Sequence, residues 1–130
     1  MIAVDSSALL AILLGEPEST ACTDALIASP SCFVSSFTLF ETRIVVHRIA
    51  PRDGLAELAI LLDRARMTTV PFDDDQAAIA FEAYRRFGKG VHPAALNIGD
   101  CASYAVAKSR GLPLLFKGND FAKTDIASAL

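Results

Sequence analysis

Short runs of consecutive apolar residues alternate along this chain with longer stretches in which apolar residues return every three or four positions. The first pattern predicts buried strands, and the second predicts helices with one apolar face. Strands are expected at residues 1–4, 31–35, 68–72 and 112–116. Helices are expected at residues 8–14, from 17 or 18 to 28, from 36 or 38 to 46, and at 55–62, 76–87 and 97–110. The tail, residues 121–130, fits either a short strand or a short helix.

This alternation of strands and helices is typical of an α/β domain with a mostly parallel sheet. Of the residues, 52% are hydrophobic and none is tryptophan, which suits a buried sheet covered by helices rich in alanine and leucine. The length, residues 1–130, is that of a single domain. The helix at 97–110 is apolar on nearly all sides, so we expect it in the interior.

Composition and charge disfavour several classes of protein. No apolar run reaches the roughly 18 residues that a membrane span needs, and no basic region precedes the first apolar run, as a secretory signal would require. The three cysteines share no metal-ligand spacing, so we expect reduced thiols in a cytoplasmic protein. The net charge of −3 gives no general attraction to nucleic acid, so an RNA contact must come from a local patch. The densest basic cluster, Arg85, Arg86 and Lys89, is the candidate, although a solvated helix end is the more common explanation.

Four acids fall where the strands of such a sheet end. Asp5 follows the first strand, Glu41 is expected in the first turn of the helix after the second, and Asp120 follows the fourth. Asp100 begins the helix that leads into the fourth strand. Ligands of parallel sheets bind outside the carboxyl ends of the strands. We therefore expect the four side chains at one edge of the sheet.

Each acid also has a structural explanation. Asp5 can cap the helix that follows it. Residues 38–41 (TLFE) fit a capping box, and residues 97–100 (NIGD) resemble one with Asp in place of Glu. Residues 119–120 are ordinary turn residues. Singly, these roles are the more common ones, but four carboxylates at one edge would repel one another unless a cation neutralises them.

The chemistry of the candidate ligands indicates the kind of cation. Carboxylate oxygens without histidine or cysteine favour Mg²⁺ or Mn²⁺ over zinc. Such an ion polarises a phosphoryl oxygen and activates water for in-line attack. Residues 73–75 (DDD) are better explained as a helix start, and His47 and His92 stand alone in the sequence.

Four segments together resemble the VapC-type ribonucleases of the PIN-domain family. They are residues 1–9 (MIAVDSSAL), 40–42 (FET), 96–101 (LNIGDC) and 114–121 (LLFKGNDF). The resemblance covers essentially the whole chain. It implies a three-layer α/β/α sandwich, dependence on Mg²⁺ or Mn²⁺, and cleavage of RNA. It also implies a homodimer and a cognate VapB-type antitoxin that covers the active site.

The resemblance implies roles for individual residues. Asp5 and Asp100 match the family's central metal ligands, and Glu41 matches its third acid, acting directly or through water. Ser7 matches a supporting hydroxyl residue near the metal. The fourth acid of many members would lie at position 118, which is glycine here. Asp120 is its expected substitute, with Asn119 as a neutral partner.

Two other interpretations are open at this point. A receiver-like signalling domain is also a small α/β fold that uses Mg²⁺, and it would place Asp73 as phosphate acceptor and Lys117 after the last strand. Against it, a receiver needs two adjacent acids after the first strand, and Asp5 is followed by two serines. The third interpretation is a PIN fold without activity that acts as a binding partner, which the glycine at position 118 supports.

Overall fold

Four parallel strands form the central sheet in the computed structural model, which describes residues 1–130. The strands are β1 (Ile2–Val4), β2 (Cys32–Ser35), β3 (Met67–Val70) and β4 (Leu114–Leu115). Their order across the sheet is β3-β2-β1-β4. From β1 the chain adds β2 and β3 on one side, and it then returns to add β4 on the other side of β1. A ligand of such a sheet is expected at this reversal, outside the carboxyl end of β1.

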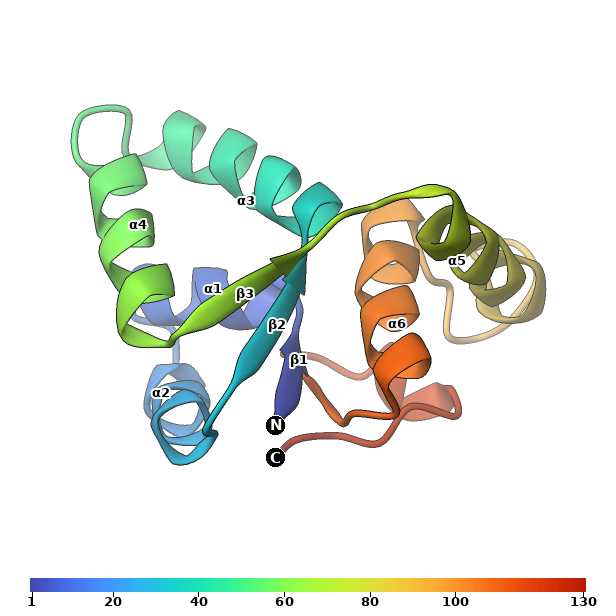
Figure 1. The fold of residues 1–130 in the computed structure, drawn as a ribbon. Coiled ribbons are helices and arrows are strands. Elements are labelled where there is room, and N and C mark those ends of the chain that lie inside the picture. The colour runs from blue at the N-terminus through green and yellow to red at the C-terminus, as the bar shows by residue number, and fades with distance from the viewer.

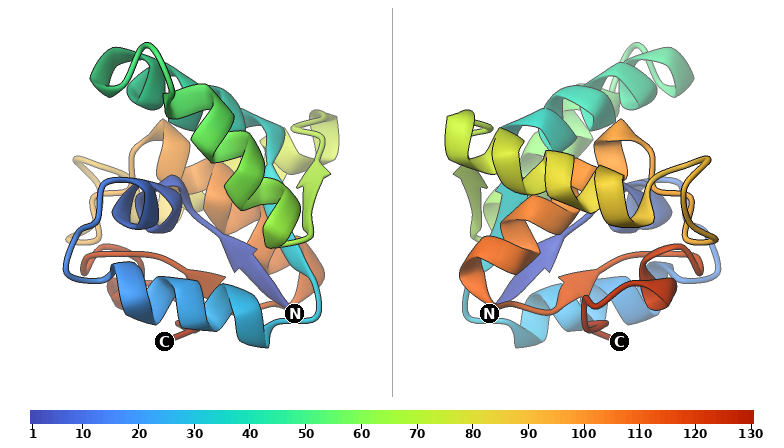
Figure 2. Two further views of the ribbon diagram at one scale, coloured as in Figure 1. Left: turned by 90° about the vertical axis from the view of Figure 1, so that its left-hand side faces the viewer. Right: turned by 90° about the vertical axis from the view of Figure 1, so that its right-hand side faces the viewer.

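Helices cover both faces of this sheet (Figures 1 and 2). The helices are α1 (Ser6–Leu13), α2 (Ser19–Ala28), α3 (Ser36–Ile49), α4 (Gly54–Arg64), α5 (Asp74–Phe87), α6 (Ile98–Arg110) and the short 3-10 helix η1 (Phe121–Lys123). Helices α1, α2 and α4 lie on one side of the sheet, and α5 and α6 lie on the other. The expected three-layer α/β/α sandwich is confirmed. No helix combines the length and the apolar character needed to cross a membrane.

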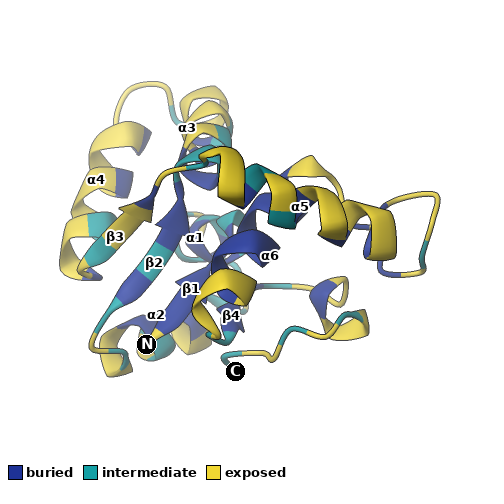
Figure 3. Cartoon of the chain, turned by 45° about the vertical axis from the view of Figure 1, so that its right-hand side comes forward, coloured by how far each residue is buried: buried dark blue, intermediate teal, exposed yellow.

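The alternation of side chains along the strands builds a separate core on each face. Ile2 and Val4 of β1 pack among the buried residues of α1 and α2. Ala3, between them, points to the opposite face and belongs to the core built by α6 and, beyond it, α5. Burial is densest along β1, β2, β4 and α6, while most of the edge strand β3 and the outward faces of the other helices are exposed (Figure 3).

Helix α6 is the most buried helix, as its composition predicted. All its residues from Cys101 to Ala107 are buried. Asn97 caps its start in a complete capping box, and Gly111 ends it in the left-handed conformation with φ of 61°. Because α6 leads into the parallel strand β4, its first turn lies at the carboxyl edge of the sheet.

The expected capping box at residues 38–41 is wrong. Helix α3 begins at Ser36 and is capped by the side chain of Ser35, so Thr38 is already inside the helix. Glu41 therefore lies in the second turn of α3 and not in the first. Ser35 and Thr38 could each cap a helix here, and Ser35, the last residue of β2, is the one that caps α3.

Three smaller differences concern element ends. Helix α2 begins at Ser19 and not at residue 17 or 18, because these two residues form a turn. Strand β4 has two residues, since Pro113 has no amide with which to extend the ladder. Of the two alternatives for the tail, the short helix is formed, as η1; the later residues make a single bridge from Ser128 to Leu114 but no strand.

Candidate active site

Asp5 is the buried acid of the candidate site. It directly follows β1, caps α1 and is 3% exposed. Its Oδ2 atom accepts hydrogen bonds from the Ser7 amide at 3.1 Å and from the Ser7 hydroxyl at 2.6 Å. Ser103 of α6 donates to the other oxygen, Oδ1, at 2.5 Å. Neutral donors therefore hold both oxygens and fix the orientation of the carboxylate.

Glu41 reaches the same edge from α3. Its carboxylate packs directly against Gly99 and fills the place where a β-carbon would lie. Gly99 is buried in the first turn of α6, beside Asp100. Burial, and then the neighbouring charges of Asp5 and Asp100, raise the pKa of Glu41.

Asp100 caps α6 and also carries a carboxyl group with a raised pKa. Its Oδ2 accepts from the Asn97 amide at 3.0 Å, while the Asn97 side chain accepts from the Asp100 amide at 2.8 Å. Burial raises the pKa of Asp100 to about 6; the Asn97 hydrogen bond opposes this rise, and the charges of Asp5 and Asp120 add to it. The expected capping role and the expected proximity to other acids therefore both hold for this residue.

Asp120 lies in the exposed loop after β4. It occupies the position before η1, where its side chain makes no capping bond. Its charge contributes to the raised pKa of Asp100, so it lies within electrostatic reach of that residue. Gly118 has φ of 99°, a conformation that glycine adopts readily and other residues do not. The loop geometry thus disfavours an acid at position 118. Asn119 is exposed beside Asp120.

No positive side chain neutralises these four acids. The ion pairs of the chain join other residues: Arg85 with Glu82, Arg86 and Lys108 with Asp125, and Lys117 with Glu16 and Glu18. The mutual repulsion of the carboxylates is therefore not relieved within the protein.

The donor set fits Mg²⁺ or Mn²⁺ by its chemistry, because it consists of carboxylate oxygens. No three acidic, histidine or cysteine side chains converge closely enough to coordinate one ion together. Mg²⁺ commonly binds through one or two carboxylates and keeps several of its waters. The arrangement therefore fits an ion held by two carboxylates, with the remaining acids acting through water.

Ser7 joins the ends of two strands at this edge. Its hydroxyl donates to Asp5 and accepts from the Lys117 amide at 3.0 Å. The Lys117 ammonium group forms an ion pair with Glu16 in the turn before α2. The loop that carries Asp120 is thereby tied to the region around Asp5.

Ser103 is a residue of this site that reasoning from the sequence missed. It lies one turn beyond Asp100 in α6, and its hydroxyl contacts Thr38 Oγ1 at 3.2 Å in addition to Asp5. The signal in the sequence was its place as the only serine in the buried run 101–107, three positions after an acid. Gly99 was missed as well. A β-carbon at this position would overlap the Glu41 carboxylate, which the sequence alone does not show.

The basic cluster lies at the end of α5. Arg85 and Arg86 each form an ion pair with a protein acid, at 2.9 and 3.5 Å. Lys89 forms no ion pair, and its amide donates to the Leu96 carbonyl at 3.0 Å. Lys89 therefore lies close to the start of α6, where Asp100 is found. A contact of the cluster with RNA stays a prediction.

The remaining candidates make no hydrogen bond or ion pair with the four acids. Asp73 caps α5 by accepting from the Gln76 amide at 3.0 Å. His47 is exposed in the last turn of α3, and Nδ1 of His92 accepts from the Ala94 amide at 3.0 Å. In a receiver domain the first strand lies between the second and third, whereas β1 here lies between β2 and β4. The receiver-like interpretation is therefore wrong.

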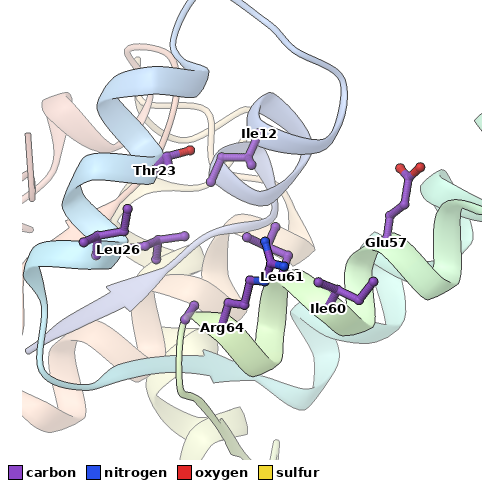
Figure 4. Close-up of a pocket in the computed structure, with 9 residues that line it drawn as sticks. Ile12, Thr23, Leu26, Glu57, Ile60, Leu61 and Arg64 are labelled. Atoms are coloured by element: carbon purple, nitrogen blue, oxygen red, sulfur yellow. The ribbon is translucent and has the colours of Figure 1, made fainter.

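An apolar groove of about 330 Å³ lies elsewhere, between α1, α2 and α4 (Figure 4). Ile12, Leu26, Ile60 and Leu61 contribute apolar side chains to it, with Arg64 beside them. None of the four acids lines this groove. It is therefore separate from the candidate site.

Comparison with known sequences finds relatives along nearly the whole chain. The model of the family described as PIN domain matches residues 2–127. A "Ribonuclease VapC" of Mycolicibacterium smegmatis is 46% identical over 125 residues, which cover 96% of this chain and 97% of that protein. "Ribonuclease VapC30" of Mycobacterium tuberculosis is 44% identical over 125 residues, covering 96% and 95%.

Two solved structures share the fold. The crystal structure of Mycobacterium tuberculosis VapC20, described as a sarcin-ricin loop cleaving toxin, superposes with a TM-score of 0.79 at 18% identity and covers 98% of this chain and 97% of that one. A toxin–antitoxin complex from Klebsiella pneumoniae gives a TM-score of 0.73 at 16% identity, covering 100% and 98%. At these identities the likeness concerns the fold.

Proposed function

This chain belongs to the PIN domain family, in its VapC branch, and from that premise we propose that it is the toxin of a toxin–antitoxin pair, an endoribonuclease that uses Mg²⁺ or Mn²⁺. The observation that carries the proposal is the group of four acids without a positive partner at the carboxyl edge of the sheet. In this proposal residues 1–130 act as one domain.

The proposed ligands are Asp5 and Asp100, with Glu41 acting through water, since no three acids converge closely enough to bind one ion together. When bound, the ion activates a water and stabilises the charge that develops on the phosphate and the leaving oxygen. Asp120 is proposed as the fourth acid of the reaction, supported by its effect on the pKa of Asp100. Ser7 holds Asp5, and Asn119 is proposed as the neutral partner of Asp120.

The products follow from the type of catalysis. Attack by the RNA's own 2′-hydroxyl requires an acid and a base of near-neutral pKa, most often histidines, and neither histidine contacts the four acids. Hydrolysis by metal-activated water leaves a 5′-phosphate and a 3′-hydroxyl. End-group analysis of cleaved RNA tests this, with cleavage lost in EDTA. Cyclic-phosphate ends formed in EDTA would overturn both the mechanism and the roles of the acids.

The proposed partners are RNA and a VapB-type antitoxin. An arginine of the antitoxin is suited to cover the site, because its planar guanidinium pairs with carboxylates through two hydrogen bonds. Arg85, Arg86 and Lys89 are proposed to contact the RNA backbone, with Lys89 free of ion pairs. The charge reversal Lys89→Glu should weaken RNA binding without changing metal binding.

Growth tests the proposal in the cell. Expression of the wild type alone should arrest growth, expression with the antitoxin should relieve it, and Asp100→Ala at matched protein level should be harmless. Equal arrest by both proteins would show that catalysis through Asp100 is not the cause.

A second function is a catalytically inactive PIN fold that only binds a partner. The glycine at position 118, in a conformation that disfavours an acid, is the observation that favours it. Antitoxin binding without any metal-dependent cleavage of RNA by the wild type would establish this alternative.

We also propose a homodimer. Phe72, Phe81, Tyr84 and Ile98 line an apolar hollow of about 200 Å³ between α5 and the start of α6. Phe81 is 64% exposed and Ile98 is 70% exposed. Exposed apolar patches of this kind are typical of protein interfaces, and the occupant that we propose is a second copy of the chain.

A further inference from the structure

Ser103 is a buried hydroxyl group at a position where an apolar residue would pack more easily. It is 1% exposed and lies in the middle of α6, among neighbours that are almost all apolar. Burying a hydroxyl group costs free energy unless it is hydrogen-bonded. A serine inside a helix often returns its hydrogen bond to its own backbone, but Ser103 donates to Asp5 Oδ1, 98 residues away, at 2.5 Å. Packing alone does not explain a serine here.

The direction of the hydrogen bonds at Ser103 follows from counting protons. An ionised carboxylate accepts and does not donate, so the single hydroxyl proton of Ser103 goes to Asp5. The contact between Ser103 Oγ and Thr38 Oγ1, at 3.2 Å, then needs the proton of Thr38. The chain of donors therefore runs from Thr38 to Ser103 to Asp5.

These hydrogen bonds join the three elements that carry Asp5, Glu41 and Asp100. Thr38 lies one turn before Glu41 in α3, and Ser103 lies one turn after Asp100 in α6. Asp5 follows β1, and its other oxygen is held by Ser7. The two hydroxyl groups thus fix the Asp5 carboxylate relative to both helices, from the buried side of the site.

We propose that Ser103, supported by Thr38, is a positioning residue for Asp5 in the metal-dependent reaction. The proposal rests on the proposed function above. Ser103 touches neither the RNA nor the ion in this role; it holds the Asp5 carboxylate in the one orientation that suits a ligand. Groups that orient metal ligands in this way typically change metal affinity or activity by 10- to 100-fold when removed.

The test compares Ser103→Ala with Ser103→Thr, which keeps the hydroxyl group. Mn²⁺ affinity is measured by electron paramagnetic resonance, RNA cleavage at saturating metal gives kcat and KM, and melting in EDTA reports the fold. Ser103→Ala should weaken Mn²⁺ binding about 10-fold or more and lower kcat by a similar factor, with KM for RNA within about twofold. Ser103→Thr should recover most of both losses. Ser109→Ala, at the far end of α6, is the matched control and should bind Mn²⁺ as the wild type does.

Thr38→Val tests the same series of hydrogen bonds from its other end. It should produce a smaller change of the same kind, and no further change in the Ser103→Ala background, because Thr38 acts only through Ser103. If Ser103→Ala does not fold, this variant decides the question alone.

The outcomes separate this proposal from the proposed function. A loss of melting temperature with Mn²⁺ affinity and kcat within about twofold of the wild type would overturn the positioning role. A wild type that binds Mn²⁺ without cleaving RNA would overturn the proposed function, while the Mn²⁺ affinities of the variants would still decide the role of Ser103. A wild type without measurable Mn²⁺ binding would overturn both.

Discussion

The carboxyl group of Asp100 makes the folded protein sensitive to pH. Its pKa is about 6 in the folded protein, against about 3.9 in an unfolded chain. Between these values the folded state binds more protons than the unfolded state, so stability falls as pH rises through this window and stays lower above it. The raised pKa of Glu41 acts in the same direction.

Asp100→Asn should therefore stabilise the metal-free protein at pH 7.5. Asparagine keeps an oxygen that accepts from the Asn97 amide but removes the repelled charge. After discounting for solvent screening we expect about 1 kcal/mol, or about 4 °C in melting temperature, and little change at pH 4. Melting in EDTA at the two pH values measures this, with the exposed Asp24→Asn as control. An equal gain at both pH values would contradict the charge-based explanation.

Gly99 allows a second test at the residue scale, because its only evident role is to admit the carboxylate of Glu41. Gly99→Ala should leave the fold intact, since the displaced group is the end of a flexible side chain and alanine favours a helix. Cleavage of RNA should fall about as far as it does in Glu41→Ala. In the Glu41→Ala background, Gly99→Ala should cost nothing further, and additive losses would show that Gly99 acts by another route.

At the scale of elements, α6 does two separate jobs. Its first turn carries Asp100 to the edge of the sheet, and its buried middle joins the core beside β1. Its end depends on Gly111, whose φ of 61° lies in the left-handed region. The cap at Gly111 can be tested separately from the site, because it lies at the opposite end of the helix from Asp100.

Gly111→Ala should lower stability without affecting catalysis. A residue with a β-carbon in the left-handed conformation costs about 1 kcal/mol or more, so the melting temperature should fall by about 4 °C. Gly111→Asn should lose less, because asparagine tolerates this conformation. Specific activity per folded molecule should match the wild type in both variants, and a large loss of kcat would mean that the end of α6 is coupled to the site.

At the scale of the whole molecule, the candidate site exists only when several elements are assembled. Asp5 follows β1, Glu41 is in α3, Asp100 is in α6 and Asp120 follows β4. An ion that binds these acids therefore binds the folded state alone. Ligand binding then stabilises the fold by mass action, by about 2.7 kcal/mol at a hundred times the dissociation constant.

Mg²⁺ or Mn²⁺ should accordingly raise the melting temperature of the wild type by about 5 to 10 °C at such a concentration. Asp5→Asn combined with Asp100→Asn should abolish most of this rise. Thermal unfolding with and without the metal measures both effects. A rise of the same size in the double variant would mean that the ion stabilises the protein from another place.

The proposed dimer is also a property of the whole molecule. Phe81→Asp puts a charge into the exposed hollow on α5 and should convert the dimer to a monomer in sedimentation experiments. Ile27→Asp, on α2 and 78% exposed, is the matched control that should stay dimeric. A wild type that sediments as a monomer at micromolar concentration would contradict the proposed dimer.

The sequence by itself determined the parallel α/β fold, the buried helix α6 and the placement of the acids at one edge of the sheet. These features depend on order along the chain: Asp5 and Asp120 follow strands, and Asp100 begins a helix that returns to the sheet. The capping box of Asn97 and Asp100 was equally visible, because it joins residues three positions apart. At the start of α3 the local pattern left Ser36 and Thr38 open as the first residue, and the structure decided for Ser36 with Ser35 as the cap.

Only the tertiary structure decided which side chains touch across these elements. Ser103 reaches Asp5 across 98 residues, and the carboxylate of Glu41 occupies the place of a β-carbon at Gly99. Such contacts depend on how far each helix is rotated and how closely it lies against its neighbours. Periodicity along a single chain specifies which face of a helix is buried, but not which residue of another element that face will meet, because the packing of all the layers together sets this.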